Sequence, residues 1–277
     1  MRHDHISLLL EADKLTVRPA FSLNFEETRM KRLLAALFIA FSQNALQVHS
    51  IAGQETTEPA IQVEKNSEKK ERRIRAIPGT PTIDGEIDEI WKTARKAKTD
   101  RYVESESTVS ATEAATAEFR CLWDEKHVYI LAVVEDAVLS ADADEDWQQD
   151  SVEFFIDENM ARSTVYDGDD SQYRVNCEGN VSFGQVAQEA ITASVKKTKT
   201  GYVVEAAIEL TSVKAAKGTK IGFDVQVNDD TDGSGTRGAI MKWSDDTNES
   251  YQDVSRLGTL VFGAARKPKA KADAKSK

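Results

Sequence analysis

The fold is set by residues 117–136, which read AEFRCLWDEKHVYILAVVED. In the first half, Ala117, Phe119 and Cys121 alternate with polar residues, and an apolar period of two indicates a half-buried β-strand. In the second half, apolar residues occupy both faces through Val134, which is typical of a central strand covered on both sides. Turn residues separate the halves, so this stretch predicts two antiparallel strands.

The same alternation recurs along the chain between turn residues. It predicts an all-β fold, an antiparallel, jelly-roll-like β-sandwich that spans residues 76–263. The side chains expected on the outward faces include Glu153, Arg174 and Gln226, a mixture of hydrogen-bond donors and acceptors. The alternating segments are DSVEFFID (150–157), SQYRVNCEG (171–179), GYVVEAAIEL (201–210), IGFDVQVND (221–229) and LGTLVF (257–262).

Composition excludes several classes of partner. The 277 residues include 36 basic and 47 acidic side chains, and the formal net charge of −11 repels nucleic acids and anionic membranes. A neutral ligand or a cation suits this charge better. The two cysteines, Cys121 and Cys177, are too few for a disulfide framework, and the sequence leaves open whether they pair or stay free.

The N-terminal part predicts export. Met30 begins MKRLLAALFIAF, in which a basic start precedes an apolar run too short to span a bilayer. We interpret residues 30–52 as a signal peptide rather than a buried helix, and residues 1–29 as a non-native extension or a mis-assigned start. A charged, flexible leader (53–75) and a basic, disordered tail (264–277) flank the sandwich. We expect a secreted, periplasmic or cell-envelope protein without a membrane span.

Two aromatic residues lie in polar surroundings. Trp147 is flanked by five acidic residues and two glutamines in SADADEDWQQD, and Tyr251 lies in DDTNESYQD. Such rings are difficult to bury, but they suit carbohydrates, because a pyranose ring presents an apolar C–H face for stacking. Three other tryptophans adjoin apolar residues and are expected in the core: Trp91, Trp123 and Trp243.

A run of blocks across residues 76–263 resembles the family nine carbohydrate-binding modules. The blocks include IDGEIDEIW, DWQQDSVEFFIDEN, DDSQYRVNCEGN and KWSDDTNESYQDVSRLGTL, in the order typical of the family. The resemblance implies a non-catalytic β-sandwich associated with xylanases, which holds the end of a xylan, cellulose or related glycan chain. A separate glycoside hydrolase is a candidate partner, and the sequence leaves open whether the protein works beside one.

The resemblance implies a set of ligand-binding residues. Trp147 would form one ring of an aromatic clamp, with Tyr251 at the position where the family usually has a second tryptophan. Glu153 and Arg174 would bind sugar hydroxyls beneath the clamp. The full implied set is Trp147, Glu153, Arg174, Gln226, Asn248 and Tyr251.

Structural calcium also accompanies this fold in the family, and acidic loops supply the oxygen ligands that calcium prefers. Asp84 and Asp88, near the start of the domain, are candidate ligands. The alternative is that both carboxylates cap turns.

Other functions remain open from the sequence. A glycoside hydrolase needs two carboxylates, for which Glu153 with Asp224 or Glu205 could serve, but a catalytic barrel needs about 250 residues. Haem binding would depend on His127, and a colourless protein would exclude it. A structural role in the cell envelope would show no response to sugars.

Overall fold

The computed structural model describes residues 71–184 and 190–265. The regular elements within these ranges are β-strands and short 3-10 helices. The all-β prediction is confirmed. The expected extension, the signal peptide, residues 53–70 of the leader and most of the tail lie outside the described residues. No helix in the described ranges is long and apolar enough to cross a membrane.

A first sheet carries the outward-facing polar residues. Its strands run in the spatial order β8, β7, β6, β11, β13 and β1, with β12 added beside β11 and β3 beside β12. The bounds are β8 (Val181–Phe183), β7 (Asp170–Asn176), β6 (Ser151–Asp157), β11 (Lys220–Asp229), β13 (Gly258–Phe262), β1 (Arg73–Pro78), β12 (Ala239–Lys242) and β3 (Arg101–Tyr102).

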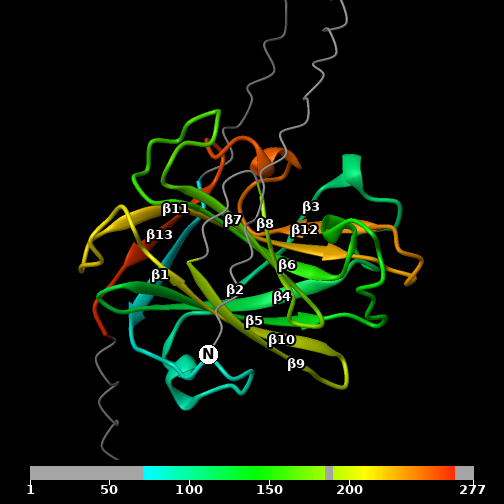
Figure 1. The fold of residues 1–277 in the computed structure, drawn as a ribbon, viewed down its shortest axis with the longest axis horizontal. Coiled ribbons are helices and arrows are strands. Elements are labelled where there is room, and N and C mark those ends of the chain that lie inside the picture. The colour runs from blue at the N-terminus through cyan, green and yellow to red at the C-terminus, as the bar shows by residue number, and fades with distance from the viewer. Residues whose placement is uncertain (1–70, 185–189, 266–277) are drawn as a thin grey trace, which may run out of the picture. The chain divides into compact units, whose positions relative to one another are not determined.

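A second sheet lies against the first (Figure 1), in the order β1, β4, β5, β10 and β9, with β2 paired to β4. The bounds are β4 (Thr116–Trp123), β5 (His127–Glu135), β10 (Gly201–Glu209), β9 (Ile191–Lys197) and β2 (Ala97–Lys98). Four 3-10 helices lie in the connections: η1 (Glu89–Thr93), η2 (Glu104–Glu106), η3 (Asp146–Gln148) and η4 (Glu249–Tyr251).

Strand β1 joins the two sheets at a corner of the sandwich. Residues 73–76 pair with β13 of the first sheet, whereas Ile77 and Pro78 pair with β4 of the second. Both pairings are parallel, so the sandwich is antiparallel except at this corner. The strand begins at Arg73, within the range expected to be leader, because charged residues alternate here with buried Ile74 and Ala76.

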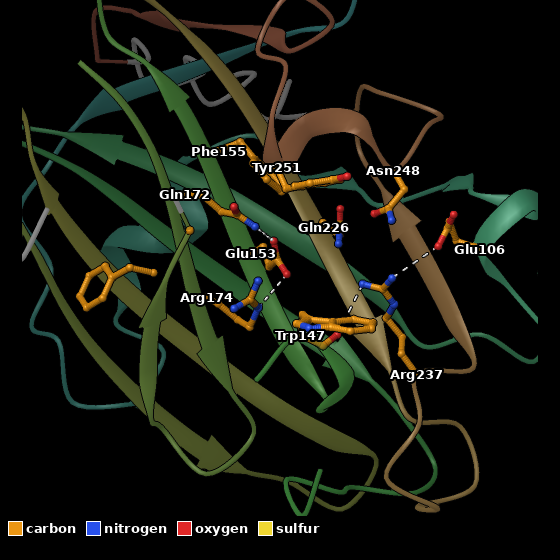
Figure 2. A pocket seen from close by; sticks show the side chains of 12 residues that line it. Glu106, Trp147, Glu153, Phe155, Gln172, Arg174, Gln226, Arg237, Asn248 and Tyr251 are labelled. Atoms are coloured by element: carbon orange, nitrogen blue, oxygen red, sulfur yellow. Dashed lines mark hydrogen bonds and ion pairs between the residues drawn. The ribbon is translucent and has the colours of Figure 1, made fainter. Parts of the chain in front are cut away.

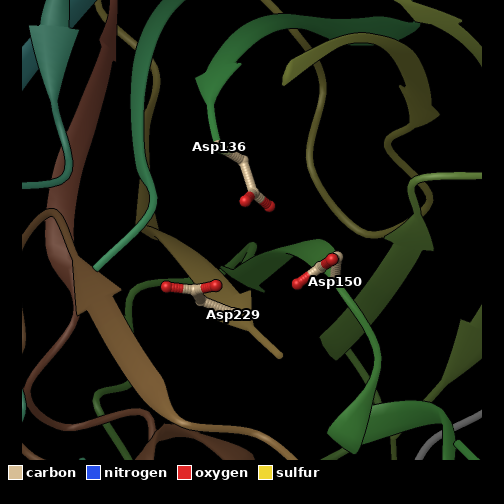
Figure 3. A group of neighbouring side chains, drawn as sticks. All are labelled: Asp136, Asp150 and Asp229. Atoms are coloured by element: carbon tan, nitrogen blue, oxygen red, sulfur yellow. The ribbon is translucent and has the colours of Figure 1, made fainter. Parts of the chain in front are cut away.

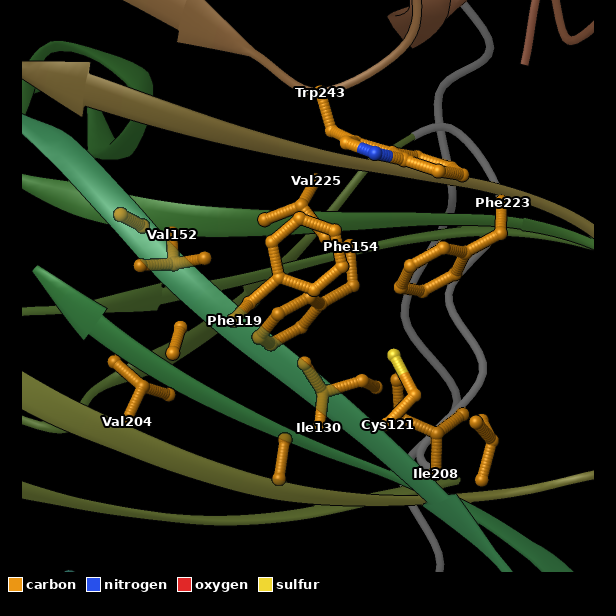
Figure 4. Close-up of a cluster of buried hydrophobic side chains, with 14 of the residues drawn as sticks. Phe119, Cys121, Ile130, Val152, Phe154, Val204, Ile208, Phe223, Val225 and Trp243 are labelled. Atoms are coloured by element: carbon orange, nitrogen blue, oxygen red, sulfur yellow. The ribbon is translucent and has the colours of Figure 1, made fainter. Parts of the chain in front are cut away.

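The core between the sheets is built by the alternation read from the sequence. The inward side chains of β6 and β11, such as Phe154 and Phe223, meet those of β4 and β5 (Figure 4). Phe119 packs against Phe223 and Trp243 with ring centroids 6.1 and 5.7 Å apart, within the range of favourable aromatic contacts. Cys121 and Cys177 are both buried and free, so they do not pair.

The outer face of the second sheet is covered as well. Trp91 of η1 packs on this face beside Leu131, which explains why β5 is apolar on both sides. Its Nε1 donates a 2.7 Å hydrogen bond to Oε1 of Glu205, a buried residue of β10. Trp91 and Trp243 are buried as predicted, and Trp123 is half-buried and stacked on Phe262.

Candidate functional site

One outward-facing row of side chains crosses four strands of the first sheet. Glu153 of β6 pairs in register with Gln226 of β11 on one side and with Arg174 of β7 on the other. Arg174 in turn pairs with Ser182 of β8, to which its Nη1 donates a 3.1 Å hydrogen bond. Side chains in register on adjacent strands are neighbours, so the pairing register brings these polar groups together.

Glu153 is held from several sides. Its side chain is buried, and Oε1 accepts hydrogen bonds from Arg174 Nε at 2.8 Å and from Asn228 Nδ2 at 2.7 Å. Gln172 Nε2 donates to the other oxygen. Burial alone would raise the pKa of Glu153, but Arg174 and these hydrogen bonds outweigh it and hold the pKa below its ordinary value of 4.5. The carboxylate is therefore ionised at neutral pH and fixed in orientation.

Two exposed aromatic rings flank this row. Trp147, in η3, is 40% exposed, and Tyr251, in η4, is 44% exposed. Figure 2 shows the rings on opposite sides of a pocket, with Glu153 and Gln226 between them. The cavity measures about 550 Å³, and all six residues expected to contact a ligand line it. The structure thus brings Trp147, Glu153, Arg174, Gln226, Asn248 and Tyr251 to one place.

The segment that carries Tyr251 is anchored by a buried lysine. Lys242 Nζ donates to the backbone oxygen of Thr247 at 3.1 Å and lies 3.4 Å from Asp245 Oδ2. Asp245 also accepts a 2.8 Å hydrogen bond from Arg256 Nε. Burial would raise the pKa of Asp245, but Lys242 and Arg256 outweigh it and lower the pKa. This ion network fixes the loop below the exposed ring.

Half of the lining residues were not predicted from the sequence. Phe155 and Gln172 lie two residues from Glu153 and Arg174 on the same strand faces, so the period of two could have found them. The loop-borne residues could not be found this way, because alternation carries no information outside strands. The residues missed are Glu106, Phe155, Gln172, Phe183, Gly184 and Arg237.

The carboxylate pairs considered for hydrolysis do not meet at the pocket. Asp224 is fully buried, and its oxygens accept 2.8 Å hydrogen bonds from the backbone N–H groups of Ser244 and Asp245. Glu205 lies in the second sheet, where it binds Trp91. Neither residue lines the cavity with Glu153.

Asp84 and Asp88 lie in turns. Asp84 Oδ1 accepts a 2.9 Å hydrogen bond from the backbone N–H of Glu86, and Asp88 Oδ2 accepts one of the same length from Thr82. These contacts agree with the turn-capping alternative. Among the described residues, neither aspartate belongs to a group of three acidic side chains that could share a metal ion.

A different acidic group has the chemistry of a cation site. The carboxylates of Asp136, Asp150 and Asp229 come from the ends of β5, β6 and β11, and they offer oxygens within 4.8 Å of one another (Figure 3). Burial, with repulsion inside the group, raises the pKa of Asp136 to about 6 and that of Asp150 to about 8. Asp136 Oδ2 and Asp229 Oδ1 are buried, and neither has a hydrogen-bond partner among the described residues. Hard, unpaired oxygens of this kind fit calcium.

A second acidic group, Asp157, Asp169 and Asp170, is already satisfied by its own loop. Asp157 accepts hydrogen bonds from the backbone N–H groups of Ala161 and Arg162 at 3.2 and 3.0 Å. Asp169 and Asp170 also accept backbone N–H bonds within this loop. The unpaired oxygens therefore distinguish the first group.

Comparison with known proteins identifies the family. Residues 83–264 match the family model described as "Carbohydrate family 9 binding domain-like", which covers more than half of the chain. The chain belongs to carbohydrate-binding module family 9 (CBM9). The resemblance read from the sequence is therefore confirmed, and the described domain is a carbohydrate-binding module.

The CBM9 region is similar to parts of larger enzymes. It is 47% identical over 183 residues to endo-1,4-beta-xylanase A of Thermotoga neapolitana, covering 66% of this chain and 17% of the relative. It is 41% identical over 188 residues to exoglucanase XynX of Acetivibrio thermocellus, covering 68% of this chain and 17% of that enzyme. The chain thus spans under a fifth of the length of these relatives.

Two solved structures share the CBM9 fold. A CBM9 module from Caldicellulosiruptor kristjanssonii in complex with cellotriose has a TM-score of 0.64 and 35% identity, covering 72% of this chain and 97% of that one. A structure of a CBM9 module from the same organism in complex with glucose has a TM-score of 0.64 and 34% identity, covering 72% and 100%.

We expect Arg174→Met to destabilise this CBM9 domain by about 3–5 kcal/mol at neutral pH, because it leaves the buried Glu153 carboxylate without its cationic partner. Pairing lowers the folded-state pKa of Glu153, so its stabilisation is present above the ordinary value of 4.5 and is lost as the pH falls through the lowered pKa. Without Arg174 we expect burial to raise this pKa in the variant. The deficit should therefore shrink toward pH ~4.

Urea denaturation of both proteins across this pH range measures the effect. The double variant Glu153→Gln/Arg174→Met serves as a control and should recover part of the loss at neutral pH. A deficit that is constant with pH would contradict the assigned ion pair.

Proposed function

We propose that the CBM9 pocket holds the end of a xylan- or cellulose-type chain, with one sugar ring stacked between Trp147 and Tyr251. The supporting observation is the pair of exposed rings on opposite sides of a fixed polar row. Aromatic faces remove the apolar C–H surface of a pyranose from water, and ionised or amide groups between them bind its hydroxyls. Glu153 and Gln226 lie where they can make such bonds (Figure 2).

The charge of the pocket favours a neutral ligand. Two acidic residues, Glu106 and Glu153, and two basic residues, Arg174 and Arg237, line it, so their formal charges cancel. Glu153 and Arg174 are already paired with each other. A charged sugar would gain no net attraction, whereas a neutral sugar finds donors and acceptors in fixed positions.

We propose that the chain itself is non-catalytic and supports polysaccharide breakdown or uptake beside a separate glycoside hydrolase. The relatives that carry this region are named as xylanases and an exoglucanase, and the region makes up 17% of two of them. The solved CBM9 structures hold cellotriose and glucose. At the pocket, the ionised Glu153 lacks the raised pKa that a catalytic acid needs.

We expect full-length protein to bind xylobiose and cellobiose, because the clamp recognises a free sugar ring. Trp147→Ala should weaken binding at least tenfold, as is usual for a central aromatic anchor. Isothermal titration calorimetry, with intrinsic fluorescence beside it, measures both. Reduced alditols of the same sugars should bind weakly if the reducing-end ring is the one held.

Val165→Ala, at an exposed apolar position that does not line the pocket, is the control and should bind like the wild type. The same samples should release no reducing sugar from xylan. A folded protein that responds to no sugar would favour the structural envelope role, and release of reducing sugar would favour the hydrolase.

We further propose that calcium binds Asp136, Asp150 and Asp229 and offsets their mutual repulsion. Two observations support a calcium site. The group offers hard oxygen donors, and two of its buried carboxylate oxygens have no hydrogen-bond partner in the described part of the chain. The ion would link the ends of β5, β6 and β11.

Calcium at a hundredfold excess over its dissociation constant should stabilise the fold by about 2.7 kcal/mol, and a chelator should reverse this. Asp229→Asn should abolish most of the response, whereas Asp84→Asn, the control, should retain it. Thermal unfolding with calcium or with EGTA is the measurement. If Asp84→Asn alone abolishes the response, the site lies near the start of the domain, and if the wild type shows none, the calcium proposal fails.

We also propose that residues 30–52 direct export, supported by the order of basic, apolar and small residues after Met30. We expect the protein from the culture medium or periplasm to begin near Gly53, because cleavage after Ala52 follows the small-residue pattern. Intact mass spectrometry checks this, with the cytoplasmic fraction as the control. A mature chain that retains residues 30–52 would contradict it.

A further inference from the structure

Arg237 places a cation against the Trp147 ring. It lies between β11 and β12, its side chain is only 7% exposed, and its Cζ lies 5.0 Å from the centroid of the ring. Among the described residues, Trp147 has no aromatic stacking partner, and its indole N–H has no hydrogen bond. The guanidinium therefore supplies the ring with a contact that no neighbouring aromatic residue provides.

The guanidinium is fixed by groups from different parts of the fold. Nη1 donates a 3.1 Å hydrogen bond to Asn228 Oδ1 and a 3.4 Å bond to the backbone oxygen of Trp147. Nη2 lies 3.7 Å from Oε2 of Glu106, on η2 (Figure 2). The backbone N–H of Arg237 donates to Gln148 Oε1 at 2.7 Å. Arg237 thus ties its own loop to the loop of Trp147 through two hydrogen bonds, and it is the donor in both.

Asn228 connects this support to the polar row. Its Nδ2 donates to Glu153 Oε1 at 2.7 Å, and its Oδ1 accepts hydrogen bonds from Gln226 at 2.8 Å and from Arg237. One side-chain amide therefore links the carboxylate of the pocket to the cation beside the ring. A displacement of Arg237 would therefore disturb both the Trp147 ring and the hydrogen bonds around Glu153.

We propose that Arg237 is a positioning residue, which orders the Trp147 ring for stacking and aligns it with the Glu153 row. This rests on the proposed function, because the ring matters only where a sugar stacks on it. Ordering an exposed side chain on binding lowers affinity, and a ring ordered beforehand avoids that loss. A guanidinium is suited to this role, since its flat face attracts an indole ring while its edge donates hydrogen bonds.

The test uses full-length protein labelled with 5-fluorotryptophan, whose four resonances are assigned by single substitutions of the four tryptophans. Arg237→Gln should shift and broaden the Trp147 resonance in the absence of sugar and leave the other three unchanged. It should also weaken cellobiose binding roughly 5- to 30-fold, the range expected for loss of a desolvated cation–ring contact. Arg237→Lys should restore part of both effects.

Arg95→Gln, at an exposed arginine outside the pocket, is the matched control and should change neither readout. If Arg237→Gln does not fold, Glu106→Gln replaces it and should move the Trp147 resonance in the same direction to a smaller extent. The unchanged resonances of the three remaining tryptophans show that each variant is folded.

An unchanged Trp147 resonance with lost affinity would overturn the positioning role, since Arg237 would then act on the sugar directly. An altered resonance with unchanged affinity would overturn it as well. If the wild type binds neither cellobiose nor xylobiose, the proposed function fails and this proposal with it. The sugar-free resonances would then still report whether Arg237 orders the ring, so the two failures are distinguishable.

Discussion

The buried Glu153 carboxylate is the constraint on which the pocket depends. Removing a charge from water is costly, and the cost is met only when every oxygen of the carboxylate has a good partner. Here β7 supplies Arg174 and Gln172, and β11 supplies Asn228. Because side chains alternate between the two faces of a strand, a shift in the register of β6 by one residue would turn the charge into the core.

The polar row and the two rings of the site are carried by different parts of the fold. The strands hold ionised and amide groups rigidly, whereas Trp147 and Tyr251 lie in short 3-10 helices of the connecting loops. Loops can vary while the sheet stays constant, so under the proposed stacking the affinity for a sugar and the choice of sugar can change through the rings without loss of the fold. The apolar core on the other side of β6 makes this possible, because Val152 and Phe154 fix the strand independently of the pocket.

Alternation in the sequence predicted the strands and the polar row, because the side-chain period of a strand is fixed by its geometry. It also marked Trp147 and Tyr251, since large rings in polar segments contradict normal burial. It could not predict Arg237 or Glu106, which reach the pocket from irregular loops. It also missed the group of Asp136, Asp150 and Asp229, whose members lie up to 93 residues apart and meet only at strand ends. Alternation did not predict the parallel pairing of β1 for the same reason, because the topology of the fold decides which strands pair.

The supports of the two rings differ in a way that bears on Tyr251. On that side the loop is held by Lys242, a point charge that binds backbone and side-chain oxygens beneath the helix and does not touch the ring of Tyr251. On the other side Arg237 packs against the Trp147 ring itself. A change between tyrosine and a larger ring at position 251 therefore alters the stacking area but leaves the contacts of Lys242 with the loop intact. The same exchange at position 147 would alter the ring and its contact with Arg237 together, so the two halves of the clamp differ in how readily they can vary.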